Sequence, residues 1–186
     1  MDFYRNLEEL FKTKKILFFQ LRLKKENKQK IIKIAKNIKK LTKKYNIKLI
    51  INDDPNLAIK INADGCHIGQ RDFNIKKARE ILKNKILGIT CHNSIKLAKI
   101  AINIKADYLA FGSFYQSKTK KVKHKANIKI LNLAKKITNI PIVAIGGINS
   151  KNYKKLLLNK ANFLAISGYI WENNKYKPIE AIKKLR

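Results

Sequence analysis

Two carboxylates stand where they could hold a divalent cation. Asp53 follows the apolar stretch 48–52, and Asp72 follows the apolar stretch 65–69. If these stretches are neighbouring parallel strands, their carboxyl ends meet at one edge and bring two hard oxygen ligands together. Proteins usually hold Mg²⁺ with one or two carboxylates, completed by substrate phosphates and waters. The pair therefore predicts a Mg²⁺ site, although Asp54 beside it is also typical of a helix cap.

Cationic side chains follow two other apolar stretches. Arg22 and Lys24 alternate with leucines just after 16–21, and Lys120 lies in the basic segment after 108–112. Three cations at one edge could neutralise a diphosphate. Together with the two acids, they indicate a Mg²⁺–diphosphate ligand.

Small residues follow the last two apolar stretches. Gly146 and Gly147 come after "IVAI", and Ser167 and Gly168 come after "FLAI". A glycine pair alone is often only a turn. In parallel barrels, however, backbone N–H groups at this place often bind phosphate, because small residues let a ligand approach. The pattern suggests a second ligand with a monophosphate.

The elements that must position these residues alternate along the chain. Seven near-continuous apolar runs are typical of buried parallel strands: 16–21, 48–52, 65–69, 86–90, 108–112, 142–146 and 163–167. Amphipathic helical patterns lie between them, and "NADG", "KADY" and "KANF" recur where a helix gives way to a strand. The pattern predicts a parallel α/β fold in a single domain, 1–186. A (β/α)8 TIM barrel would lack its first strand, since the chain opens on a helical pattern; an open seven-stranded sheet is the alternative.

Composition narrows the class of protein. The chain of 186 residues carries a net charge of +31, yet only five of its 43 basic residues are arginines, and the lysines are spread along every helical pattern. A nucleic-acid surface would favour clustered arginine, so we expect solvated lysine faces that attract anionic substrates. No apolar run reaches the length of a membrane span, and two cysteines make no disulfide framework. We expect a cytoplasmic protein without nucleic-acid or membrane partners; a homo-oligomer stays open.

The histidines and cysteines give weaker signals. Cys91 and His92 could form a thiol–imidazole pair, but adjacent residues at a strand end rarely face each other. His67 lies inside an apolar run and is expected to pack in the core, while His124 lies in the basic segment and is expected to be solvated.

Taken in order, the motifs resemble the thiamine phosphate synthase family of (β/α)8 barrel enzymes. The resemblance runs from about residue 10 to residue 170. It rests on "QLRLKK", "LIINDD", "ADGCHIGQRD", "ILGITCHN", "ADYLAFGSFYQSKTK", "IPIVAIGGIN" and "ANFLAISGYI", in the family's order and spacing.

The resemblance implies a role for each group of residues. It assigns the pyrimidine diphosphate to Gln20, Arg22, Lys24, Asn52, Thr90 and Lys120. Of these, the expected catalytic residues are Arg22, Lys24, Thr90 and Lys120. It assigns Mg²⁺ to Asp53 and Asp72, and the thiazole phosphate to Ser117, Lys118, Thr119, Gly147, Ser167 and Gly168. Thr90 and Ser117 replace the family's usual Ser and Thr, which keeps each hydroxyl.

The resemblance also implies a reaction. Family members join an aminopyrimidine diphosphate to a thiazole phosphate, releasing pyrophosphate and forming thiamine phosphate. The bond to diphosphate breaks first, and the thiazole nitrogen captures the resulting pyrimidine cation. Such a step needs charge stabilisation and alignment rather than a protein nucleophile.

Three other functions compete with this one. A thiazole tautomerase would share the fold and use a histidine at the position of His92, but it needs no diphosphate or Mg²⁺ site. An inactive barrel remnant is suggested by the absent first strand. A basic nucleic-acid-binding protein would bind with a steep dependence on salt.

Overall fold

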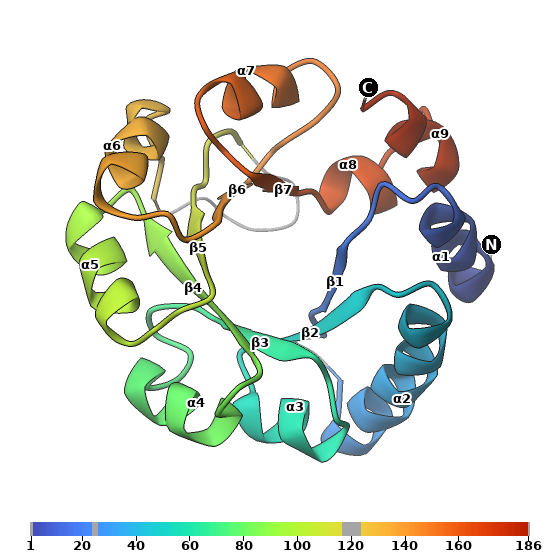
Figure 1. Ribbon diagram of the computed structural model, residues 1–186. Helices are drawn as coiled ribbons and strands as arrows, with labels where there is room; N and C mark the ends of the chain where they lie inside the picture. The colour runs from blue at the N-terminus through green and yellow to red at the C-terminus, as the bar shows by residue number, and fades with distance from the viewer. Residues whose placement is uncertain (1, 24–25, 117–123, 186) are drawn as a thin grey trace. The chain divides into compact units, whose positions relative to one another are not determined.

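The computed structural model describes residues 2–23, 26–116 and 124–185 (Figure 1). The chain forms two compact units, an N-terminal unit of residues 1–88 and a C-terminal unit of residues 89–186. The strand β4 (Ile86–His92) begins in the first unit and ends in the second. Of the predicted site residues, Lys24 and the segment Ser117, Lys118, Thr119 and Lys120 lie outside the described residues.

The N-terminal unit alternates helices and strands. Its elements are α1 (Phe3–Lys12), β1 (Phe18–Leu21), α2 (Lys28–Lys44), β2 (Lys48–Asn52), α3 (Pro55–Lys60), β3 (Gly65–Ile68) and α4 (Ile75–Leu82). β1 pairs in parallel with β2, and β2 pairs in parallel with β3. The helices lie on one side of these strands (Figure 1). All four residues of β3 are buried, as expected of a strand inside a parallel sheet.

The first helix is fastened to this unit by aromatic and ionic contacts. The Phe11 ring lies 5.9 Å from the Phe19 ring of β1, between ring centres. Glu8 accepts hydrogen bonds of 2.7 Å from the Lys44 ammonium and from the Tyr45 hydroxyl at the end of α2. The amphipathic pattern at the start of the chain therefore forms a packed helix, as predicted.

The C-terminal unit repeats the alternation. Its elements are α5 (Ile95–Asn103), β5 (Tyr108–Phe111), α6 (Lys129–Ile137), β6 (Ile142–Ile145), α7 (Tyr153–Leu158), β7 (Phe163–Ala165), α8 (Gly168–Trp171) and α9 (Pro178–Lys183). β5 pairs in parallel with β6, and β6 with β7. Together the units confirm a parallel α/β fold with seven strands in the described residues. Within those residues, no helix combines the length and the apolar character needed to cross a bilayer.

The repeated sequence before the strands has a structural cause. The Asp64 carboxylate accepts a hydrogen bond of 2.9 Å from Leu49 N in β2, one strand back. In the C-terminal unit, the Asn162 side chain accepts one of 2.9 Å from Ile142 N in β6. In both units an Asp or Asn side chain therefore satisfies an N–H at the start of the preceding strand, which helps to fix the register of the pair.

Candidate active site

A cavity of about 310 Å³ opens at the carboxyl ends of β1 and β2 in the N-terminal unit. Its polar lining residues are Arg22, Asn52, Asp53 and Asp54. Its apolar lining residues are Leu21, Leu23, Ile31, Ile51 and Leu57. The cavity therefore brings together three of the predicted site residues, Arg22, Asn52 and Asp53. The apolar half of the cavity was not predicted. The alternation of Leu21 and Leu23 with polar residues is the sequence pattern that could have indicated it.

Gln20 belongs to the same cluster through a direct contact. Its side-chain amide donates a hydrogen bond of 2.8 Å to the Asn52 side-chain oxygen. The parallel register that sets Gln20 opposite Ile50 brings the ends of β1 and β2 together. Two amides in one hydrogen-bonded pair still offer a free donor and acceptor face for a ligand.

The two neighbouring carboxylates Asp53 and Asp54 differ in their tasks. Asp54 caps α3, because its carboxylate accepts a hydrogen bond of 2.8 Å from Leu57 N. Asp53 has a left-handed backbone, with φ of 65°, and its N–H donates to the carbonyl of His67 at 2.8 Å. The cap explains Asp54 without a ligand, whereas Asp53 is turned into the cavity lining by the chain's path between β2 and α3.

The charges of Asp53 and Asp54 act on a buried thiol of β3. Burial, and then the charges of Asp53 and Asp54, raise the pKa of the Cys66 thiol above its usual range. Cys66 is fully buried, and its thiol therefore stays protonated. A cation would relieve the field that the two carboxylates create here.

Asp72 lies in a turn that follows β3. Its N–H donates to the Gly69 carbonyl at 3.4 Å, and a side chain at position 69 would collide with the Asp72 carboxylate. The carboxylate also acts on His67, which is buried as predicted: burial lowers the pKa of His67 to about 4, while the Asp72 charge opposes that shift. His67 is therefore neutral near pH 7. Asp53 contacts the His67 carbonyl through its backbone N–H, and the Asp72 charge acts on the His67 ring.

The C-terminal unit carries a second group of predicted residues. Thr90 is a half-buried residue of β4, between the buried Ile89 and Cys91. Burial raises the pKa of the Cys91 thiol to about 12, so the thiol is not a nucleophile near pH 7. The prediction that Cys91 and His92 do not act as a catalytic pair is consistent with this burial.

Gly146 and Gly147 lie at the end of β6 against the chain that leaves β5. Their φ angles are 98° and 64°, and a side chain at position 147 would collide with the backbone of Tyr115 and Gln116. Tyr115 N donates to the Gly146 carbonyl at 3.1 Å. These glycines therefore admit a neighbouring segment of protein, whereas the sequence pattern suggested either a simple turn or a phosphate site.

Backbone donors remain available at this junction. In the described part of the chain, the N–H groups of Gly147 and Ile148 donate to no protein acceptor. Unused N–H groups next to a glycine are typical of phosphate sites. Ser167 precedes α8, and within the described residues its side chain makes no capping hydrogen bond to that helix.

Comparison with known proteins identifies the family. The model of the thiamine monophosphate synthase family matches residues 1–170. The chain belongs to this family. It is 64% identical to the thiamine-phosphate synthase of Pelagibacter ubique (strain HTCC1062), across the whole chain and 90% of that relative. It is also 42% identical to the thiamine-phosphate synthase of Nitrosomonas eutropha, across 82% of the chain and 72% of the relative.

Solved structures agree with the family assignment. The thiamine phosphate pyrophosphorylase of Pyrococcus furiosus superposes with a TM-score of 0.89 at 26% identity, covering 100% of this chain and 88% of that one. A 3-hexulose-6-phosphate synthase superposes at 0.66 with 16% identity, covering 97% of this chain and 92% of that one, which shows a shared fold alone. The family's parallel α/β fold is thereby established for this chain.

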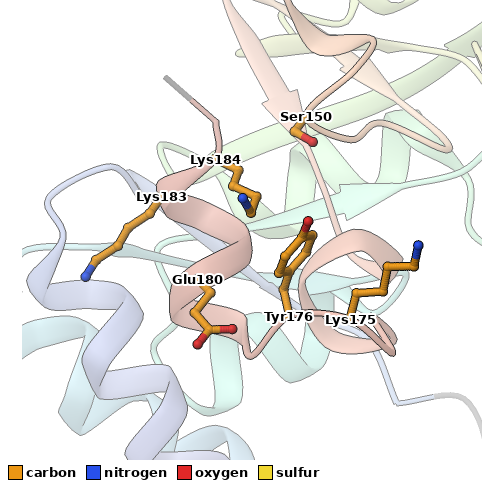
Figure 2. A pocket seen from close by; sticks show the side chains of 6 residues that line it. All are labelled: Ser150, Lys175, Tyr176, Glu180, Lys183 and Lys184. Atoms are coloured by element: carbon orange, nitrogen blue, oxygen red, sulfur yellow. The ribbon is translucent and has the colours of Figure 1, made fainter.

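A larger, open cavity of about 780 Å³ lies elsewhere in the C-terminal unit (Figure 2). It is lined by Ser150, Lys175, Tyr176, Glu180, Lys183 and Lys184. The Lys184 ammonium lies 4.5 Å from the centre of the Tyr176 ring, and Glu180 accepts a hydrogen bond from Lys177 N. None of the residues that the family motifs identify lines this cavity, and its surface lysines are explained by the basic composition of the chain.

Proposed function

We propose that this protein is a thiamine-phosphate synthase that condenses 4-amino-2-methyl-5-hydroxymethylpyrimidine diphosphate with thiazole phosphate and releases pyrophosphate. The observation that carries the proposal is the cavity in which Arg22, Asn52 and Asp53 meet, in a chain that belongs to this family along its length. We further propose a (β/α)8-type barrel as the architecture, with seven of its strands in the described residues, because strands and helices alternate in the order that this fold requires. A cytoplasmic enzyme acting on small phosphorylated substrates fits this assignment.

The N-terminal unit is suited to the diphosphate. The guanidinium of Arg22 presents paired N–H donors that match phosphate oxygens, and Lys24 follows it two residues later. The hydrogen-bonded amides of Gln20 and Asn52 can recognise the donor and acceptor edge of an aminopyrimidine. Leu21 and Leu23 give that ring an apolar wall and exclude water from the bond that breaks.

Mg²⁺ is the cation that the carboxylates of this unit fit best. Asp53 and Asp72 offer oxygen ligands, and within the described residues no group of three or more His, Cys, Asp or Glu forms a complete protein cage. Mg²⁺ needs no such cage, since substrate phosphates and waters supply its other ligands. When bound, the ion would neutralise charge on the leaving diphosphate. Asp54 already has a structural task, because one of its carboxylate oxygens caps α3.

The C-terminal unit is suited to the thiazole phosphate. The N–H groups of Gly147 and Ile148 point to a monophosphate held by backbone donors, and we assign Ser167 and Gly168 to the same ligand. Ser117, Lys118 and Thr119 are assigned to it from the family motif, and Lys120 to the diphosphate. Thr90 supplies a hydroxyl from β4 on the pyrimidine side. No residue is required as a nucleophile, and the protonated Cys91 agrees with that.

The test is direct synthesis. Purified protein is mixed with Mg²⁺ and the two substrates, and thiamine phosphate and pyrophosphate are measured together. We expect equal amounts of both products, with no product when Mg²⁺ is chelated. Folded protein that makes neither product would contradict the proposal and favour the tautomerase or the inactive remnant.

A further inference from the structure

Two histidines far apart in sequence stack on each other in the C-terminal unit. The ring centres of His92 and His124 are 4.2 Å apart, and the ring planes are inclined by 36°. His92 is the half-buried last residue of β4, and His124 is exposed. The separation is short for an aromatic pair, which typically contacts at 4.5–7 Å. His124 is therefore not merely a solvated residue of the basic segment.

Backbone hydrogen bonds connect the same two places through β5. Gly112 N donates to the His92 carbonyl at 3.1 Å, and Ser113 N donates to the His124 carbonyl at 2.9 Å. Ala126 N then donates to the Ser113 carbonyl at 2.8 Å. The ring contact and these hydrogen bonds therefore connect the end of β4, the end of β5 and the residues around His124.

Ser113 links these hydrogen bonds to the end of β6. We call Gly146, Gly147 and the adjoining residues Tyr115 and Gln116 the glycine junction. The Ser113 hydroxyl donates a hydrogen bond of 2.6 Å to the Tyr115 carbonyl, and a side chain at position 146 would collide with the same hydroxyl. Tyr115 N in turn holds the Gly146 carbonyl. A displacement of His124 would therefore be transmitted through Ser113 to the backbone donors at Gly147.

The charged sequence around His124 gives the ring contact with His92 a structural purpose. Five lysines occur between residues 118 and 125, and like charges in one short segment repel one another. Backbone hydrogen bonds at an exposed site compete with water and open readily. A ring contact adds a side-chain interaction that the lysines cannot supply.

We propose that His124, stacked on His92, is a positioning residue that fixes Ser113 and the glycine junction for binding of the thiazole phosphate. This inference rests on the proposed function for its substrate. It assigns no proton transfer to either histidine. The contact acts through geometry, so an uncharged aromatic ring at position 124 should replace the imidazole.

The experiment compares His124→Ala with His124→Phe, with Lys125→Ala as a control at the adjacent exposed position. Steady-state rates are measured while each substrate is varied in turn. We expect His124→Ala to raise the KM for thiazole phosphate about 2- to 10-fold, the range that one aromatic contact supports. The KM for the pyrimidine diphosphate and kcat should change less than the KM for thiazole phosphate. His124→Phe should restore the KM for thiazole phosphate, and Lys125→Ala should leave it unchanged.

A second readout does not depend on the reaction. Limited trypsin digestion cleaves after lysines, and mass spectrometry reports cleavage between residues 118 and 125. Faster cleavage in His124→Ala than in His124→Phe supports the contact even if the protein makes no thiamine phosphate. Equal cleavage, or an unchanged KM for thiazole phosphate in an active His124→Ala enzyme, would overturn the proposal.

Discussion

The cavity of the N-terminal unit and the glycine junction of the C-terminal unit are built from different parts of the chain. The cavity gathers charged and amide side chains, with Arg22, Asn52 and Asp53 on its wall. The junction offers N–H groups at Gly147 and Ile148, and it is shaped by backbone contacts with Tyr115 and Gln116. A diphosphate with a metal ion needs full charges, whereas a monophosphate can be bound by backbone dipoles. Substitutions of side chains should therefore damage the cavity. Changes in the shape of the backbone should damage the glycine junction.

The largest effect is expected at Asp53. Asp53→Asn keeps a residue that tolerates the left-handed backbone but removes the proposed metal ligand. We expect kcat/KM to fall roughly 100-fold or more, as loss of several kcal/mol of charge stabilisation implies. Steady-state kinetics across a range of Mg²⁺ concentrations measure the change.

Asp54→Asn is the matched control for this prediction. Asn caps helices as well as Asp does, so both α3 and activity should be retained. Equal losses in the two variants would show that the Asp53 effect is not specific to a metal ligand. Asp72→Asn should behave like Asp53→Asn while leaving the fold intact.

The next effect is expected at Gly147, where the change is in the backbone. Gly147→Ala places a side chain against the Tyr115 and Gln116 backbone at a positive φ. The KM for thiazole phosphate should rise roughly 10-fold or more, with about 1–3 kcal/mol lost from the free energy of unfolding. Urea unfolding and substrate-specific kinetics separate the two losses. Lys151→Ala, at an exposed position close by, should alter neither quantity.

A smaller effect, on the KM for the other substrate, is expected at Arg22. Arg22→Lys retains the charge but loses the paired geometry of the guanidinium. The KM for the pyrimidine diphosphate should rise about 5- to 10-fold, which corresponds to the roughly 1 kcal/mol net contribution of one hydrogen bond. The KM for thiazole phosphate should stay near its original value. A rise in both KM values would remove the distinction between the two regions.

The smallest effect concerns stability in acid. Asp64 and Asn162 do the same task in the two units, but only Asp64 titrates. Burial raises the pKa of Asp64, and the hydrogen bonds from Lys39 and from Leu49 N outweigh it, so the pKa is lowered overall. Its stabilisation is therefore present above the unfolded pKa of about 3.9 and lost as the pH falls through the lowered value.

Asp64→Asn should remove this part of the acid dependence. The cap on Leu49 N can be kept by an amide, as Asn162 shows for Ile142 N. Loss of the partly exposed ion pair with Lys39, whose two side chains are 27% and 23% exposed, should cost about 1 kcal/mol at pH 7. Urea unfolding at pH 7 and pH 3 measures both. An unchanged difference between the two pH values in Asp64→Asn would contradict the assignment.

The sequence allowed the strands and the charged residues to be predicted because both leave local signals. The run 48–52 matches β2 to the residue, and the carboxylate after it lies on the cavity as expected. The end of β4 was missed by two residues, since Cys91 and His92 resemble a loop but extend the strand. The short α8 was also missed, because its four residues are too few for a helical period.

Contacts between distant segments could not be predicted in this way. Gly146 and Gly147 indicate that other atoms approach the backbone closely at the end of β6. The sequence does not say whether those atoms belong to a ligand or to another segment of the chain. His92 and His124 are separated by residues that carry no pattern linking them, so their stacking is visible only in the folded chain. The repeat of "NADG" and "KANF" is visible in the sequence. The hydrogen bonds that explain it are not, because each joins an Asp or Asn side chain to the strand that precedes it in the chain.

The central claim is that side chains of the N-terminal unit bind a metal–diphosphate. The most direct measurement is calorimetric titration of pyrophosphate into the full chain, with and without Mg²⁺, in the unsubstituted protein, Asp53→Asn and Asp54→Asn. We predict Mg²⁺-dependent binding in the unsubstituted protein and Asp54→Asn, weakened at least roughly 10-fold in Asp53→Asn. Equally tight binding in all three proteins, or binding that does not depend on Mg²⁺, would contradict the account.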